Sequence, residues 1–260
     1  MKDFLEKGWT LFGYDPALAA WAEAAFSVAK ERVKEPGEQR WIYCEGTWFV
    51  GVDTLPNGPD GAVGAAGPVS GAAWDAVAAL YGRLPLHRGQ VSVIYPGYPR
   101  PKAGEGEAAF GYRLRRDAAH VDGLLLEGPD RRRYLKERHA YILGLPLTAC
   151  GEGASPLSVW EGSHIIMRRA FGEALMGVAP EDWDSVDLTD IYKAARREVF
   201  ETCPRRLLPA RPGEAYAVHR LALHGVAPWE AGAETPEEGR MIVYFRPEWP
   251  GSGDLWLTAP

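Results

Sequence analysis

A histidine and an aspartate stand two residues apart in the stretch AAHVDGLLLEG, residues 118–128, and an apolar run follows them. Side chains alternate across a β-strand, so on a strand His120 and Asp122 would point to the same face. An imidazole nitrogen and a carboxylate oxygen that converge on one point suit a divalent transition metal. The pair therefore predicts two ligands of a metal site, and a third ligand is needed.

The third ligand has to come from elsewhere in the chain. His224 is the best placed histidine, because in LALHGVAP it ends an apolar strand directly before a turn. His219 lies five residues earlier, an odd separation, so on one regular strand it faces away from His224 unless a bulge intervenes. We interpret His164, in the turn Gly-Ser-His, as a structural hydrogen-bonding residue, and assign no chemistry to the remaining His87 and His139.

An arginine begins the apolar stretch RMIVYF, residues 240–245. Burying Arg240 is costly without an anionic partner, and its guanidinium fork can hold a carboxylate by two parallel hydrogen bonds. A small dicarboxylate that reaches from Arg240 to the metal would satisfy both sites. Arg246 shares the strand face of Arg240 and is the substitute anion-binding residue if the register is shifted. The alternative for Arg240 is a surface salt bridge to Glu237 or Glu238.

Helices and short strands must position these residues. Asp15 as N-cap and Pro16 at the first helical position predict an amphipathic helix over 15–35, and AAWDAVAALYGRL predicts a second helix that Gly82 ends. The Gly/Pro-rich residues 52–71 between them indicate a loop. Runs rich in β-branched and aromatic residues, separated by Gly, Pro and charged turns, predict antiparallel strands within 89–98, 111–126, 139–149, 155–160, 213–226 and 240–247. A helical insertion between 165 and 200, capped at Asp187 or Thr189, interrupts them.

The chain is predicted to form a single domain, mainly β with flanking helices (α+β), over residues 1–260. Residues 1–87 form an N-terminal helical and loop region that packs on a barrel, residues 88–248 form the barrel, and residues 165–200 are the insertion. We expect the insertion, together with the Gly-rich segment before residue 71, to cover the mouth of the barrel as a lid.

Composition limits the classes of partner. Lys and Arg total 29 against 35 for Asp and Glu, a formal net charge of −6, which argues against binding to nucleic acid. No stretch stays apolar for the ~18 residues of a membrane span, and the N-terminus lacks the apolar core of a signal peptide, so a soluble cytoplasmic protein is expected. The three cysteines, at wide spacings, indicate reduced side chains.

His120-x-Asp122, the distal His224 and the later Arg240 resemble the 2-His-1-carboxylate triad and co-substrate arginine of non-haem iron(II), 2-oxoglutarate-dependent oxygenases. Within them the sequence is most similar to the phytanoyl-CoA dioxygenase family, over residues 88–248. The further matching residues are Trp160-Glu161-Gly162-Ser163-His164, Gly213-Glu214, His224-Gly225 and Pro228. Glu161 replaces the family's usual proline, Glu214 replaces its aspartate, and WEAG stands in place of its Asn-x-Ser.

The resemblance implies a double-stranded β-helix, a jelly-roll or cupin-like barrel, with the metal inside one open end. It implies Fe(II) as the metal, held by His120, Asp122 and His224, and 2-oxoglutarate as co-substrate, with its distal carboxylate on Arg240. Tyr141 in HAYILGLPL, or Tyr95 in VSVIYPGY, would give a second hydrogen bond to 2-oxoglutarate. The implied reaction consumes dioxygen, decarboxylates 2-oxoglutarate to succinate and hydroxylates a small organic molecule. The presence of Asp122 argues against a halogenase.

Two other functions fit the same residues. The missing Asn-x-Ser and the altered Glu161 favour a cupin-like metal-binding protein without turnover. A jelly-roll metalloenzyme that is independent of 2-oxoglutarate would use the same three ligands, and Arg240 would then have no special partner. The sequence gives neither the identity of the substrate nor the oligomeric state.

Overall fold

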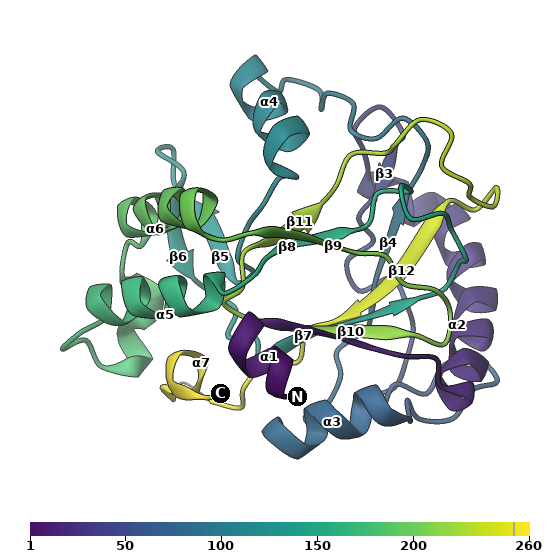
Figure 1. Cartoon of the computed structure of the whole chain (residues 1–260), viewed down its shortest axis with the longest axis horizontal. Helices are drawn as coiled ribbons and strands as arrows, with labels where there is room; N and C mark the ends of the chain where they lie inside the picture. Colours follow the sequence, from purple (N-terminus) through teal and green to yellow (C-terminus); the bar gives the residue numbers. More distant parts are fainter. Residues whose placement is uncertain (252) are drawn as a thin grey trace.

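Two antiparallel sheets face each other at the centre of the computed structural model, which describes residues 1–251 and 253–260 (Figure 1). The larger sheet has seven strands in the order β1-β10-β7-β12-β4-β3-β2, and the smaller has three in the order β11-β8-β9. A separate hairpin pairs β5 with β6. The strands are β1 (Trp9–Phe12), β2 (Ile42–Tyr43), β3 (Trp48–Phe49), β4 (Gln90–Ile94), β5 (Leu124–Glu127), β6 (Arg132–Leu135), β7 (Tyr141–Pro146), β8 (Leu157–Trp160), β9 (Arg205–Leu208), β10 (Ala215–His219), β11 (His224–Val226) and β12 (Arg240–Phe245).

Helices surround the two sheets (Figure 1). The α-helices are α1 (Lys2–Lys7), α2 (Pro16–Lys34), α3 (Ala72–Tyr81), α4 (Glu107–Arg116), α5 (Ser163–Ala174), α6 (Thr189–Thr202) and α7 (Leu255–Thr258), and the short 3₁₀ helices are η1 (Pro36–Trp41) and η2 (Pro180–Ser185). In the part of the chain that the structure describes, no helix combines the length and the apolar character that a bilayer crossing requires.

Alternation along β12 divides the interior into two layers. Met241 and Val243 point into the core beneath α2 and α3, whereas Ile242 and Tyr244 point into the space between the two sheets. Val159 of β8 lies in that same inner cluster, so both sheets contribute to it. The space between the sheets is therefore a packed interior.

The first two predicted helices are confirmed. The Asp15 carboxylate accepts a hydrogen bond from the backbone N–H of Ala17 at 2.9 Å, as an N-cap does, and Pro16 begins α2. Trp21 is buried on this helix and donates its indole N–H to Gly61 O at 2.8 Å. That bond ties residues 52–71 to α2, and Val63 and Val69 of this segment pack into the core there.

The predicted insertion is also helical. It forms α5, η2 and α6, which pack on one another and on the β5–β6 hairpin around a second apolar core. Asp187 precedes α6 and accepts a hydrogen bond from the backbone N–H of Thr189 at 2.9 Å. Its role as a lid stays a prediction.

Three sequence predictions need correction. The predicted strand over 111–126 is wrong, because residues 107–116 form α4 and only Leu124–Glu127 are in a strand. The predicted strand over 213–226 is two strands in different sheets, broken by a turn in which the N–H of Ala222 binds the carbonyl of His219 at 2.8 Å. Residues 1–87 were predicted to form only helices and loops, but they also form β1, β2 and β3. These strands pair with the two edges of the large sheet.

Mixed α/β architecture with a large antiparallel sheet is thus what the chain forms, as the expected α+β class requires. The jelly-roll barrel stays a prediction.

Candidate metal centre

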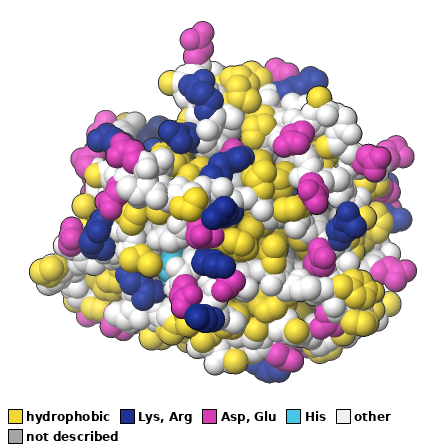
Figure 2. Space-filling model, viewed as in Figure 1, with side chains coloured by type: hydrophobic (Ala, Val, Ile, Leu, Met, Phe, Trp, Pro, Cys, Tyr) yellow, Lys and Arg dark blue, Asp and Glu magenta, His cyan; other side chains and the backbone are white. Residues whose placement is uncertain are grey.

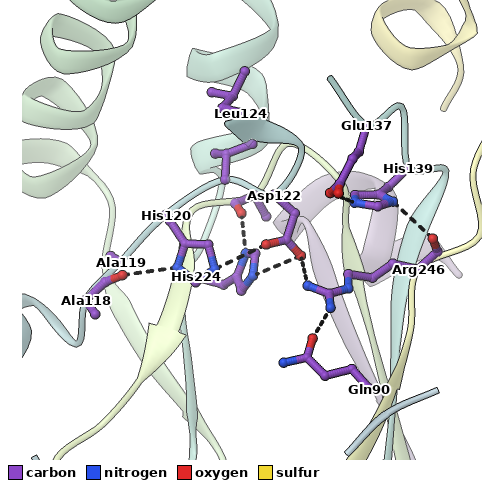
Figure 3. Close-up of polar contacts among 12 residues, drawn as sticks. Gln90, Ala118, Ala119, His120, Asp122, Leu124, Glu137, His139, His224 and Arg246 are labelled. Atoms are coloured by element: carbon purple, nitrogen blue, oxygen red, sulfur yellow. Dashed lines mark hydrogen bonds and ion pairs between the residues drawn. The ribbon is translucent and has the colours of Figure 1, made fainter. Parts of the chain in front are cut away.

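His120, Asp122 and His224 come together at one end of the space between the sheets (Figure 3). One ligand atom from each lies within 4.8 Å of the other two. His120 Nε2 lies 3.1 Å from one oxygen of the Asp122 carboxylate, and His224 Nε2 lies 3.6 Å from the other. These three side chains can hold a metal ion, as the sequence predicted, with two nitrogen donors and one oxygen donor.

Both imidazole rings are oriented by the backbone. His120 Nδ1 lies 3.0 Å from the carbonyl oxygen of Ala118, and His224 Nδ1 lies 2.9 Å from that of Ala222. A carbonyl oxygen can only accept, so each Nδ1 carries the proton and each Nε2 lone pair is left for a metal. This is the tautomer that a metal ligand needs.

Charge at the site is also set for a cation. Burial lowers the pKa of His224 to about 4, which keeps this imidazole neutral near pH 7. Burial alone would raise the pKa of Asp122, but Arg246, His224 and His120 together lower it by more than burial raises it. The pKa therefore lies well below its ordinary value, and the carboxylate is ionised. Neutral imidazoles and an ionised carboxylate are the ligating forms.

Backbone hydrogen bonds join the two histidines across the fold. The N–H of His120 donates to His224 O at 2.8 Å, and the N–H of His224 donates to His120 O at 3.0 Å. This single bridge, rather than a regular strand, aligns His120 with β11. His120 and Asp122 therefore converge with His224 from an isolated bridge and not from the predicted strand.

The turn before His120 is held from β9. Asp117 ends α4 in the left-handed conformation, and its buried carboxylate binds Arg205 through Nε at 2.6 Å and Nη2 at 3.1 Å. Its carbonyl accepts the N–H of Val226 at 3.0 Å. Gly225 lies against that carbonyl, since a Cβ added there would be 2.2 Å from Asp117 O. The His-Gly sequence therefore reflects a close approach of two backbones at the site.

The insertion supports the ligand segment from behind. Ala119 and Val121 point into the apolar core of α5 and α6, while His120 and Asp122, which alternate with them, reach the metal centre. The hydroxyl of Tyr192 on α6 accepts the N–H of Val121 at 3.3 Å.

Arg246 is the arginine that touches the triad. Its Nη1 lies 3.1 Å from Asp122 Oδ2, and its Nη2 donates to the side-chain oxygen of Gln90 (Figure 3). His87 Nε2 accepts the N–H of Arg246 at 2.8 Å, and His139 Nδ1 lies 3.0 Å from its carbonyl. The sequence offered Arg246 only as a substitute, and it missed Gln90 and the supporting roles of His87 and His139.

Arg240 begins β12 and lies on the same face as Arg246, which follows the strand, and the side chains of Tyr244 and Tyr216 lie beside its guanidinium on that face. It is 5% exposed, and its Nη1 has no hydrogen-bond partner. It also lines a cavity of about 230 Å³ that Glu152 and Glu214 border. The structure does not pair Arg240 with a described carboxylate, so neither Glu237 nor Glu238 is its partner, and its co-substrate role stays a prediction.

The two predicted tyrosines lie elsewhere. Tyr141 is fully buried in the core beneath α3 and stacks on Tyr81 at a centroid distance of 5.4 Å. Tyr95 follows β4 and packs against the same core. Neither side chain is brought to the metal centre. The cluster between the sheets instead contains Tyr216 and Tyr244, whose hydroxyl oxygens are 2.8 Å apart. The inward position of Tyr244 could have been predicted from the alternation of side chains along β12.

The other histidines are outside the triad, as predicted. His164 Nε2 lies 3.0 Å from Leu5 O, which fits a structural hydrogen-bonding residue. His219 Nε2 lies 2.9 Å from Arg168 Nη2. His219 belongs to the seven-stranded sheet, whereas His224 belongs to the three-stranded one. Trp229, which follows the His224 turn, packs against a small cluster of Cys44, Ile94 and Tyr98.

Fold and site together define a protein with two facing antiparallel sheets and a two-histidine, one-carboxylate centre at their edge. No protein-family model matches the chain. No curated protein matches it either.

Solved structures give weak likenesses. A protein described as the non-heme alpha ketoglutarate dependent carbocyclase SnoK from nogalamycin biosynthesis is 15% identical, with 94% of this chain and 82% of that chain covered and a TM-score of 0.47. AviO1 from Streptomyces viridochromogenes Tue57 is 16% identical, with coverages of 100% and 96% and a TM-score of 0.47. EctD from S. alaskensis, solved with 2-oxoglutarate and 5-hydroxyectoine, is 11% identical, with coverages of 98% and 81% and a TM-score of 0.42. Scores and identities of this size establish no shared activity.

Proposed function

We propose that the chain is a non-haem iron(II), 2-oxoglutarate-dependent oxygenase that hydroxylates a small organic molecule, with a jelly-roll fold like that of the phytanoyl-CoA dioxygenase family. The observation that carries the proposal is the convergence of two Nε2 atoms and one carboxylate, each ring fixed in its ligating tautomer by a backbone carbonyl. Three protein ligands on one side of a metal leave positions free for a co-substrate and dioxygen.

Iron(II), when bound, supplies the activation of dioxygen that is coupled to decarboxylation of 2-oxoglutarate. The protein's own groups bind and orient. His120, Asp122 and His224 hold the ion, and Arg246 with Gln90 fixes the orientation of the Asp122 carboxylate.

Arg240 is proposed to bind the distal carboxylate of 2-oxoglutarate. Support comes from its buried and unpartnered Nη1, because a buried guanidinium with a free N–H is stabilised by an anion. Burial alone would lower the pKa of Arg240, but the buried Tyr244 and Tyr216 beside it, on the inner face, raise the pKa above its ordinary value. This keeps the group cationic.

The first experiment is an anaerobic titration of the protein with iron(II) and 2-oxoglutarate. We expect a weak visible charge-transfer band, which His120→Ala and Asp122→Ala should abolish. A folded protein that gives no band under these conditions contradicts the proposal.

The second experiment separates the roles of the arginines. Arg240→Ala should raise the 2-oxoglutarate concentration required for half-maximal decarboxylation, while iron(II) affinity stays unchanged. Arg211→Ala is the matched control, since Arg211 is exposed and lines the same cavity. If 2-oxoglutarate neither raises the melting temperature nor is decarboxylated above a metal-free control, a metal-binding protein without turnover, or a metalloenzyme independent of 2-oxoglutarate, is the better assignment.

A further inference from the structure

A cluster of arginines and aromatic rings lies between α4 and α6, next to the segment that carries the metal ligands. A recess of about 510 Å³ runs along α4 and is lined by Ala108, Gly111, Tyr112, Arg115 and Arg116. On the face drawn in Figure 2, dark blue Lys and Arg side chains lie among magenta Asp and Glu side chains at the upper left, over α4 and α6. We call the recess and its neighbours Arg133, Tyr192, Arg196 and Phe200 the arginine recess.

Rings and guanidinium groups alternate through the arginine recess. The guanidinium of Arg196 lies 4.7 Å from the ring centroid of Tyr112 and 5.2 Å from that of Tyr192. Arg116 lies 4.5 Å from the ring of Phe200, and Arg133 lies 5.2 Å from that of Tyr192. A guanidinium that stacks on a ring uses its face, so the N–H donors at its edge remain free for an anion.

These positive charges have no acidic partner. The nearby carboxylates are already engaged, Asp117 with Arg205 and Asp187 with Arg132. Among residues 1–251 and 253–260, no carboxylate lies within 4.0 Å of Arg115, Arg116, Arg133 or Arg196. Arg133 Nη1 donates to Leu124 O at 3.1 Å.

The clustering of positive charges affects the pKa of Arg133. Burial, and then the charges of Arg196 and Arg131, lower the pKa of Arg133. Like charges held together without a counter-ion repel one another, so a bound anion would stabilise the cluster.

The arginine recess is joined to the metal segment by two hydrogen bonds. The Tyr112 hydroxyl donates to Ala119 O at 2.7 Å, and the Tyr192 hydroxyl accepts from Val121 N at 3.3 Å. Ala119 and Val121 flank His120, whose side chain is 45% exposed. The arginine recess therefore contacts the backbone on either side of His120.

We propose that the arginine recess binds a small molecule that carries two adjacent anionic groups, of the diphosphate class. Planar guanidinium forks bind phosphate oxygens in pairs, and several of them together favour a doubly charged group over a single carboxylate.

The test uses the metal-free full chain and inorganic pyrophosphate in isothermal titration calorimetry. We expect one saturable site, weakened at least 10-fold by Arg196→Gln and by Arg116→Gln. Arg197→Gln is the matched control, because Arg197 is the next residue on α6, is exposed, and makes none of the ring contacts. It should bind within 2-fold of the unaltered protein. Citrate and inorganic phosphate, tested in parallel, should bind more weakly than pyrophosphate.

Circular dichroism and the melting temperature check the fold of each variant. If Arg196→Gln does not fold, the exposed Arg116→Gln decides the question. Absence of saturable binding, unchanged affinity in the folded Arg196→Gln and Arg116→Gln proteins, or an equal loss in Arg197→Gln overturns the proposal. Because no iron or 2-oxoglutarate is present, this failure is distinguishable from failure of the oxygenase proposal.

Discussion

Gly225→Ala tests whether the contact between β11 and the turn at Asp117 sets the metal geometry. A Cβ at position 225 would lie 2.2 Å from Asp117 O, whereas an ordinary contact begins at 3.4 Å, so the two backbones must part by about 1.2 Å. Arg205 holds Asp117 in place, which leaves β11 and His224 to move. The reciprocal hydrogen bonds of 2.8 and 3.0 Å between His120 and His224 cannot both survive that displacement.

Metal ligands tolerate displacements of only about 0.2 Å, so the expected loss of affinity is on the order of 100-fold, together with about 1–3 kcal/mol of stability from overpacking. Titration with cobalt(II), followed by visible absorption and equilibrium dialysis, measures the affinity. Gly106→Ala is the control, since its φ is −76° and nothing lies within 4 Å of the added Cβ. If a folded Gly225→Ala protein binds cobalt(II) within 3-fold of the unaltered protein, the steric argument fails.

Three further outcomes are expected. Tyr216→Phe should cost about 1–3 kcal/mol in urea denaturation by leaving the Tyr244 hydroxyl buried alone, and Tyr216→Phe with Tyr244→Phe should recover part of that loss; a double variant no better than the single one contradicts this. Burial lowers the pKa of His164 and of His219 below their ordinary value, so the unfolded chain takes up more protons below about pH 6.5. The melting temperature of the metal-free protein should therefore fall as the pH is lowered from 7 to 5, and it should fall less steeply in His164→Gln. If the melting temperatures of the two proteins fall equally steeply with pH, His164 is not one of the groups responsible. Cobalt(II) at 100 times its Kd should stabilise the protein by about 2.7 kcal/mol but leave Asp122→Ala unchanged, as melting curves would report.

The convergence of His120, Asp122 and His224 was predictable because it depends on residue type and short spacing. His120-x-Asp122 converges whether it lies on a regular strand or on an isolated bridge, so an error in the local structure did not harm the prediction. The error itself has a physical source. Tyr112 and Leu114 alternate with arginines, a period of two that indicates a strand, but Leu114 is 43% exposed on a helix.

Contacts that depend on the parity and register of paired strands were not predictable. Tyr141 was expected at the co-substrate, but β7 turns Tyr141 and Leu143 toward the helices and Ile142 toward the inner cluster. Gln90 meets Arg246 only because β4 pairs with β12 in one particular register, which places Gln90 opposite Tyr244. A single sequence carries no signal for that pairing.

The paired backbone hydrogen bonds between His120 and His224 also bear on the order in which the protein matures. Their partners come from segments about a hundred residues apart, on opposite sides of the helical insertion, so a chain that has not yet brought its sheets together offers a metal no more than the two neighbouring ligands. Capture of the ion should then follow assembly of the sandwich instead of nucleating it, and the rate at which cobalt(II) colour develops during refolding would time the last step of closure.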